Sequence, residues 1–280
     1  MAFDIEDYKS RTGRLRWDDL DLSSFRTDPL AEWARRCLRY MHDVEYHTAC
    51  YLRDLLVHPG PYRSRGDGVS VLWVFEEYWH GEALAAVLAA HGEASGDDRV
   101  GPMRRRLGVA DKLRPLSMSA ASWVVGAEFV AVHMVWGAVN EWTTQAGYAQ
   151  LARRSGHPVL AELLRRIMRQ EGRHIDFYAS QAQARLAASA RARRLTRFAL
   201  RRFWAPVDSG VMPPSETEHL APALFSGQEG LATARRIDRR IDRLPGLAGL
   251  HLLETTVAGH TDPAPNVSDS TIVSFLRRSA

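Results

Sequence analysis

The feature that most constrains this chain is a pattern of glutamate and histidine that occurs twice along it. In each copy a single glutamate precedes a Glu-x-x-His sequence by about 30 positions, from 45 to 77 in the first copy and from 141 to 171 in the second. Residues i and i+3 lie on one face of an α-helix, about one turn apart, so the two side chains of such a pair reach the same point. The pattern therefore predicts four helices that direct these side chains to a common centre.

Helix signals delimit the first two of these helices. Asp28 as N-cap and Pro29 at the first helical position predict a helix over about 29–57. A loop rich in Gly, Pro and Arg follows, and a second helix is predicted over about 69–90, ending at Gly92. Together they form the first expected hairpin.

The second expected hairpin begins after a polar crossover. Ser117 or Ser119 is predicted to cap a third helix that runs to about position 154. Pro158 then opens a fourth helix, which is predicted to continue without a break past position 194, because no Gly or Pro intervenes.

The connections between the four helices are short, long and short, which is typical of a ferritin-like bundle. No strand-like alternation of useful length occurs, so the predicted fold is all-α. We expect a bundle over 1–205 and, over 206–280, a C-terminal helical extension packed on it. Shorter helices are predicted at about 216–225 and 228–243, and residues 260–280 are predicted to be partly flexible.

The repeated pattern is a candidate metal site. Each of its members falls in an apolar stripe of its helix, where a charge is costly unless a metal or a partner neutralises it. Four carboxylates balance two divalent ions, and such sets occur in the cores of di-iron carboxylate bundles. A buried salt-bridge network is the alternative. The predicted ligands are Glu45, Glu77, His80, Glu141, Glu171 and His174.

A third Glu-x-x-His match, Glu216 with His219, follows two prolines and has no glutamate about 30 residues before it. We interpret it as a solvated helix start. We expect the other candidates near the pattern not to bind the metal directly. Glu76 is predicted to lie in a second layer, behind the ligands, or on the surface, and His42 in the second layer. His133 is predicted to pack in the core, and Glu128 is not predicted as a ligand.

The segments E-E-Y-W-H-G-E-A-L at 76–84 and E-G-R-H at 171–174 resemble those of the soluble acyl-acyl-carrier-protein desaturases. The order of the six residues matches that family, and the resemblance covers about 29–185. It implies two iron ions with O2 as co-substrate. Glu77 and Glu171 would bridge the irons, while Glu45 with His80, and Glu141 with His174, would each bind one iron.

The resemblance also implies a catalytic role for Thr144, which would help to deliver protons at the oxygen site; a helix threonine bonded to its own backbone is the alternative. One departure stands out, because Gln170 occupies a position where the family usually has Asp. The C-terminal third also differs from the family.

The function expected from these features is an O2-dependent di-iron oxidoreductase, either an acyl-carrier-protein-linked fatty acyl desaturase or a related C–H oxidase. The alternatives are a di-iron N-oxygenase or hydroxylase of a specialised pathway, and a non-enzymatic ferritin-like protein that handles iron or peroxide. A ferredoxin-like electron donor, an acyl carrier protein and a homodimer are the partners that the resemblance implies.

The formal net charge of +4 and the pI of about 9.3 fit an acidic partner. An arginine run that could receive it comprises Arg191, Arg193, Arg194, Arg197, Arg201 and Arg202, although a solvated helix face is the alternative. No nucleic-acid module signature occurs. No apolar stretch is long enough for a membrane span, and only two cysteines are present, so a cytoplasmic location is expected.

Overall fold

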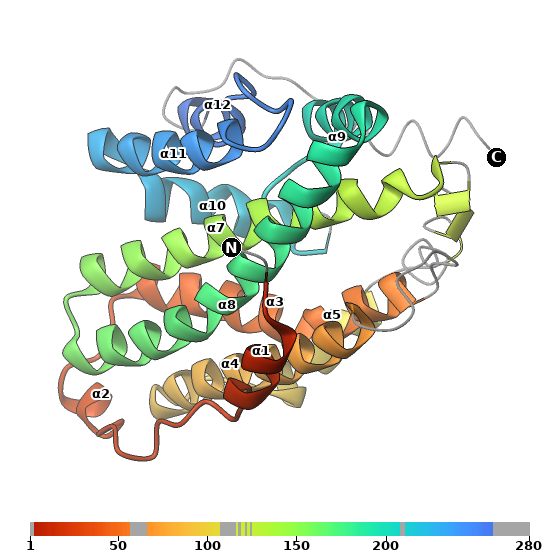
Figure 1. Ribbon diagram of the computed structural model, residues 1–280. Helices are drawn as coiled ribbons and strands as arrows, with labels where there is room; N and C mark the ends of the chain where they lie inside the picture. The colour runs from red at the N-terminus through yellow and green to blue at the C-terminus, as the bar shows by residue number, and fades with distance from the viewer. Residues whose placement is uncertain are drawn as a thin grey trace.

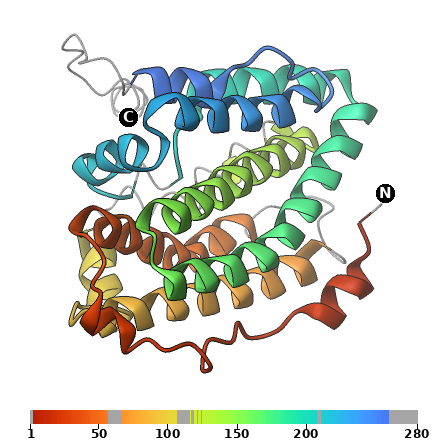
Figure 2. The same ribbon diagram turned by 90° about the vertical axis from the view of Figure 1, so that its left-hand side faces the viewer.

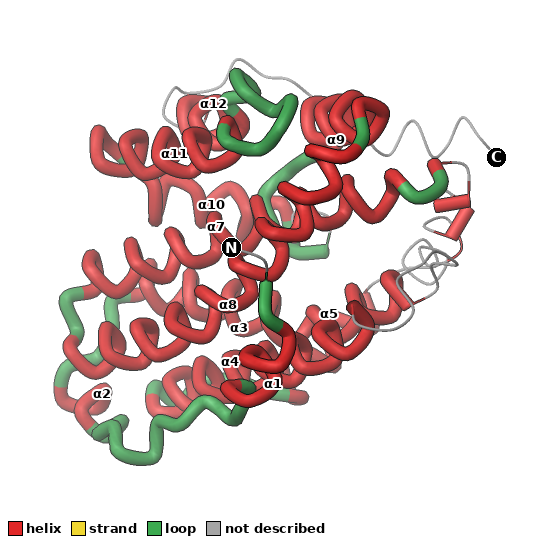
Figure 3. Tube along the Cα trace, viewed as in Figure 1, coloured by secondary structure: helices red, strands yellow, loops and turns green. Residues whose placement is uncertain are grey.

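A computed structural model describes residues 3–56, 66–106, 116, 119–120, 122–123, 125–207 and 211–259. Eleven helices lie within these residues, and the same residues contain no strand (Figure 3). The predicted all-α fold is therefore confirmed for the part of the chain that is described. None of the described helices is both long and apolar enough to cross a membrane.

Four long helices form the bundle: α3 (Glu32–Leu56), α4 (Gly66–Ala90), α7 (Glu128–Ser155) and α8 (Pro158–Ala188). Helix α3 packs on α4 and α7 packs on α8, and contacts of α4 with α8 and of α3 with α7 join the two hairpins (Figure 1). Fully buried Leu38, Leu84, Val135 and Leu164 come one from each helix, so all four share one core. The predicted pair of hairpins is present.

The N-terminal segment lies along one side of the bundle (Figure 2). It contains α1 (Ile5–Arg11) and α2 (Ser24–Thr27), and both pack on α4. Buried Tyr8 and Phe25 anchor the two short helices to the common core. In the crossover between the hairpins, α5 (Asp97–Arg106) contacts α3.

Four further helices follow the bundle: α9 (Ala190–Phe203), α10 (Pro214–Phe225), α11 (Gly227–Asp242) and α12 (Leu252–Gly259). Helix α9 packs on α7 and α8, α10 packs on α3 and α7, and α11 packs on α7 and α12. The two short helices predicted in this region correspond to α10 and α11. The predicted tail over 260–280 and most of the predicted loop over 58–68 lie outside the described residues.

Two predicted helix starts are wrong. Asp28 closes α2, because its N–H donates to the carbonyl of Ser24 at 2.9 Å, and α3 begins later, at Glu32. The third helix was expected to run from Ser117 or Ser119. The described residues over 119–125 are helical, but Gly126, with a left-handed φ of 75°, interrupts the helix, and α7 begins only at Glu128. Ser117 lies outside the described residues.

The prediction of one unbroken helix past position 194 is also wrong. Ser189 adopts an extended backbone conformation, with φ −134° and ψ 119°, and separates α8 from α9. Its hydroxyl accepts a hydrogen bond from the N–H of Ala192 at 3.1 Å, so it acts as the N-cap of α9. A serine cap, rather than Gly or Pro, ends the helix here.

Candidate metal centre

The six predicted ligands meet in the middle of the bundle, in two groups of four. One group comprises Glu45, Glu77, His80 and Glu171, and the other comprises Glu77, Glu141, Glu171 and His174. Within each group, one ligand atom per residue lies within 4.8 Å of the others. Glu77 and Glu171 belong to both groups, so the arrangement is one site with two adjoining halves.

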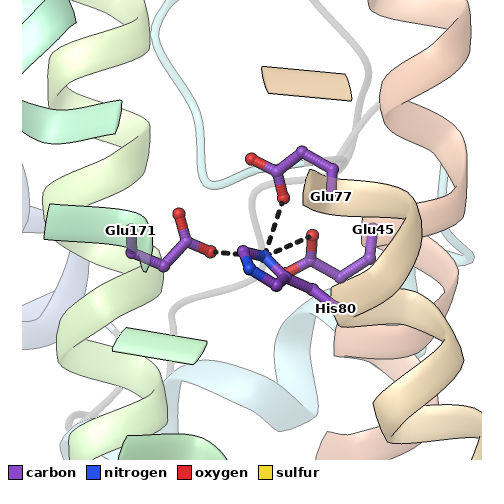
Figure 4. Close-up of side chains that lie close together, drawn as sticks. All are labelled: Glu45, Glu77, His80 and Glu171. Atoms are coloured by element: carbon purple, nitrogen blue, oxygen red, sulfur yellow. Dashed lines mark ion pairs between the residues drawn. The ribbon is translucent and has the colours of Figure 1, made fainter. Parts of the chain in front are cut away.

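In each of the two shared carboxylates, one oxygen faces the half with His80 and the other oxygen faces the half with His174. His80 Nδ1 lies 3.4 Å from Glu77 Oε2 and 3.3 Å from Glu171 Oε1, as Figure 4 shows from the side of His80. His174 Nδ1 lies 3.2 Å from the other oxygen of Glu77 and 2.8 Å from the other oxygen of Glu171. This is the arrangement that two bridging carboxylates require.

The two remaining glutamates complete the halves from α3 and α7. Glu45 Oε2 lies 3.9 Å from His80 Nδ1, and the phenol of Tyr148 donates a hydrogen bond to the other oxygen of Glu45. Glu141 accepts a hydrogen bond of 3.2 Å from the indole N–H of Trp73. All six side chains are buried, the most exposed being Glu141 at 7%.

The hydrogen bonds of Gln170 fix the orientation of His80. The side-chain amide of Gln170 donates to the carbonyl of Gly13 at 3.0 Å, which leaves its oxygen to accept from His80 Nε2–H at 2.9 Å. When the ring is neutral, as it must be to bind a metal, its lone pair lies on Nδ1, which is buried with no hydrogen-bond partner. A lone pair held in that way suits a metal ligand.

His174 is oriented by a charged partner instead. Its Nε2 lies 2.9 Å from Glu76 Oε2, and Glu76 is fully buried. Glu76 also receives hydrogen bonds from Arg173, from the Tyr8 hydroxyl at 3.2 Å and from the N–H of Gly13 at 3.4 Å. The sequence left Glu76 open between a second layer and the surface, and the structure places it in the second layer.

Gly81 allows the two helices of the first hairpin to approach beside the site. A Cβ at this position would lie 2.7 Å from two ring atoms of Tyr46 and 3.4 Å from Glu45 Cβ. The glycine that follows His80 therefore holds α4 close to α3 at the level where both contribute ligands.

Burial strongly perturbs the acid–base equilibria of the centre. Burial, together with repulsion from Glu77, raises the pKa of Glu45, and burial with repulsion from Glu171 raises that of Glu141. Burial opposes ionisation of Glu77 as well, but hydrogen bonds from Glu45 and His174 hold its pKa well below the usual range. Although burial opposes protonation of His80, the Glu171 carboxylate raises its pKa to about 9.

These shifts show how the centre balances its charge with protons. Burial also opposes protonation of His174, but hydrogen bonds to Glu171 and Glu76 raise its pKa well above the usual value. The pKa of Glu171 is lowered: burial and Glu77 act against its ionisation, and the charge of His80 favours it. The raised pKa values of Glu45, Glu141, His80 and His174 favour protons on these groups, and two divalent cations would take the place of those protons.

Other candidate residues serve elsewhere in the fold. His42 bonds Asp43 and accepts from the N–H of Gly96 at 2.9 Å, so it joins α3 to the segment before α5. Glu216 pairs with Arg36 at 2.8 Å and ties α10 to α3, so it is more than a solvated helix start.

Three further groups also make their contacts outside the centre. Glu128 pairs with Arg191 at 3.6 Å, and the ring of His133 packs beside Tyr178. A third acidic cluster contains Asp238, which caps α12 by accepting the N–H groups of Leu253 and Glu254.

Two cavities adjoin the centre at Glu45. One, of about 290 Å³, lies between α3, α4 and α5 and is lined by polar groups that include Glu82, Asp97 and Arg104. The other, of about 70 Å³, lies between the bundle and the C-terminal helices and is almost entirely apolar. Thr144 lines the apolar cavity, together with Glu45 and Tyr148.

The sequence pattern did not reveal several of these contacts. Tyr8 and Gly13 approach from the N-terminal segment, whereas Trp73 and Tyr148 approach from α4 and α7. Each of the four acts through a contact with a residue distant in sequence, which helical spacing does not report. Comparison with known proteins gives no further guide, since no protein-family model, curated protein or solved structure matches this chain.

Proposed function

We propose that this chain is an O2-dependent di-iron oxidoreductase with a ferritin-like bundle, which oxidises a C–H bond of an acyl-type substrate. The observation that carries the proposal is the position of Glu77 and Glu171, each with one oxygen near His80 Nδ1 and the other near His174 Nδ1. Carboxylate and imidazole ligands from four facing helices are the ligand set of di-iron carboxylate bundles.

The residues fit such a metal pair. The buried Nδ1 of His80 has no hydrogen-bond partner, and a cation would supply one. Glu45 and His80 would hold one ion, Glu141 and His174 the other, and Glu77 with Glu171 would bridge the two. Four carboxylates and two neutral imidazoles balance two divalent cations, which removes the cost of burying the charges.

When bound, the iron pair would supply the redox chemistry that passes electrons to O2. In a desaturation, one O2 is reduced to two waters by two electrons and two protons from the substrate, and by two electrons and two protons from outside. The external electrons require a donor, and we propose a ferredoxin-like protein for this role.

The protein side chains have separate tasks. Gln170 and Glu76 orient the two imidazoles, and Tyr148 holds one oxygen of Glu45. Thr144 lines the same cavity as Glu45, and we propose that its hydroxyl passes a proton to the reacting centre. Burial of all six ligands keeps bulk water away from the reaction.

An acyl carrier protein is the proposed carrier of the substrate. Only some of the arginines of α9 are free to bind it. Arg193 and Arg197 donate to main-chain carbonyls of this chain, so they are already in use. Arg194, Arg201 and Arg202 are exposed and remain candidates for contact with an acidic partner.

The test is anaerobic loading of the full chain with Fe(II), followed by O2 and a chemical reductant in the presence of acyl-carrier thioesters. We expect substrate-dependent O2 consumption and, by mass spectrometry, a product that has lost two hydrogens or gained one oxygen. The second product would indicate hydroxylation, the main alternative reaction.

Glu141→Gln should abolish the reaction, while Glu128→Gln, on the same helix but outside the centre, should retain it. Absence of any substrate-dependent O2 consumption by the iron-loaded protein would refute the proposal. Hundreds of irons per assembly, instead of about two per chain, would favour the ferritin-like storage alternative.

A further inference from the structure

We propose that the C-terminal extension forms one wall of the substrate site, and that the apolar cavity beneath it holds the aliphatic part of the substrate. This assignment rests on the proposed function, because it places the cavity at the centre where oxidation would occur. It gives α10 and α12 a direct role in selecting the substrate.

The cavity is positioned for this role by the residues on its two sides. On the bundle side it is lined by Glu45, Thr144 and Tyr148, so its contents lie beside one of the predicted ligands. On the other side Leu224 of α10 and Val257 of α12 line it. A molecule in this space would therefore contact the metal centre and the extension at once.

The chemistry of the walls selects an uncharged aliphatic group. Apart from Glu45, which faces the centre, no charged residue is among the described residues that line this cavity. A charged group would lose its hydration there without gaining a partner. The polar cavity between α3, α4 and α5 has Glu82, Asp97 and Arg104 in its wall beside apolar groups, so it can also receive water or polar groups.

The size of the cavity limits what it can hold. Its volume of about 70 Å³ is roughly half that of an engineered cavity of about 150 Å³ that binds benzene. A short aliphatic segment fits this volume, and a longer one would extend beyond it. We therefore expect the protein to prefer substrates with few carbons beyond the oxidised position.

Gly147 keeps this space open from the bundle side. A Cβ at this position would lie 3.4 Å from Met41 Cε and 3.6 Å from Leu224 Cδ1, so alanine fits but a larger side chain would enter the cavity. Glycine is unfavourable within a helix, which is consistent with a need for space at this point. Leu224 limits the same space from α10.

The experiment measures binding separately from oxidation. 1-Butanol, 1-hexanol and 1-octanol are titrated calorimetrically into the full chain under argon, where no O2 chemistry can occur. We expect saturable binding that Gly147→Leu weakens at least tenfold, while Leu224→Ala shifts the preference toward the longer alcohols. Ala221→Leu fills the cavity from α10 and serves as a second variant if Gly147→Leu does not fold.

The matched control is Leu247→Ala, which removes a fully buried leucine of the same extension that does not line the cavity. It should leave alcohol binding unchanged. Equal binding by the wild type, Gly147→Leu and Ala221→Leu would overturn the assignment, as would binding that responds only to Arg104→Gln in the polar cavity.

A second arm distinguishes failure of this inference from failure of the proposed function. If O2-dependent oxidation occurs but its chain-length profile is the same in Leu224→Ala as in the wild type, the cavity assignment fails. If the alcohols bind as expected but the iron-loaded protein consumes no O2 with any substrate, the oxidase proposal fails, and the cavity stands as an apolar ligand site.

Discussion

Metal binding to this centre should release four protons for each pair of divalent ions. The four buried carboxylates carry four negative charges when ionised, and the raised pKa values of Glu45, Glu141, His80 and His174 favour a compensating proton on each of these groups in the metal-free centre. Each of these groups must lose its proton before it can act as a ligand. The number follows from charge balance and does not depend on how the protons are shared.

The released protons determine how affinity varies with pH. Four protons correspond to a change of about four in the logarithm of the overall binding constant per pH unit, or about 5 kcal/mol. Affinity rises with pH because fewer protons must be displaced. The slope becomes smaller as pH approaches 9, where His80 loses its proton without metal.

Calorimetric titration with Fe(II) under argon, in buffers of different ionisation enthalpy, measures the proton number directly. Glu141→Gln should reduce the release by one, because an amide has no proton to lose at this pH. A release of zero or one proton in the wild-type chain would refute the reasoning, since it would mean that the carboxylates are already ionised in the metal-free centre.

Three other predictions concern the surroundings of the centre. Gln170→Leu removes the acceptor for His80 Nε2–H and should lower metal affinity about 10- to 100-fold in chelator competition. In the metal-free chain, protonated His80 contributes stability that is complete below about pH 6.5 and is lost as pH rises through 9, so the urea midpoint should fall over that range. Gly81→Ala, whose Cβ would lie 2.7 Å from the Tyr46 ring, should destabilise the fold by about 1–3 kcal/mol in urea unfolding. Gly172→Ala meets no atom within 4 Å and should instead gain about 0.5–1 kcal/mol, and an equal effect of the two substitutions would contradict this account of Gly81.

The bundle and the meeting of six side chains could be predicted from sequence because both depend on helical periodicity. The two side chains of a Glu-x-x-His pair lie on the same face of any α-helix. Two copies at nearly equal spacing from a single glutamate therefore predict helices that face one another. Burial of all six residues at 7% exposure or less agrees with the apolar stripes in which the sequence places them.

The features that could not be predicted are of two kinds. Some depend on which of two neighbouring helices a capping residue serves, and others depend on contacts between residues far apart in the sequence. Asp28, a residue type that favours helix N-caps, instead forms the C-cap of α2, and Ser189 ends a helix that no Gly or Pro interrupts. The bond between Tyr148 and Glu45, and that between Trp73 and Glu141, join positions about 70 to 100 residues apart. Such pairs follow from the three-dimensional packing, which periodicity along one helix does not contain.

Anomalous diffraction at the iron edge, from crystals of the full chain grown anaerobically with Fe(II), tests the central claim most directly. We expect two iron peaks per chain, one beside His80 Nδ1 and one beside His174 Nδ1, with Glu77 and Glu171 contacting both. A single peak, or iron bound only at surface carboxylates while these six side chains keep their hydrogen bonds to one another, would contradict it.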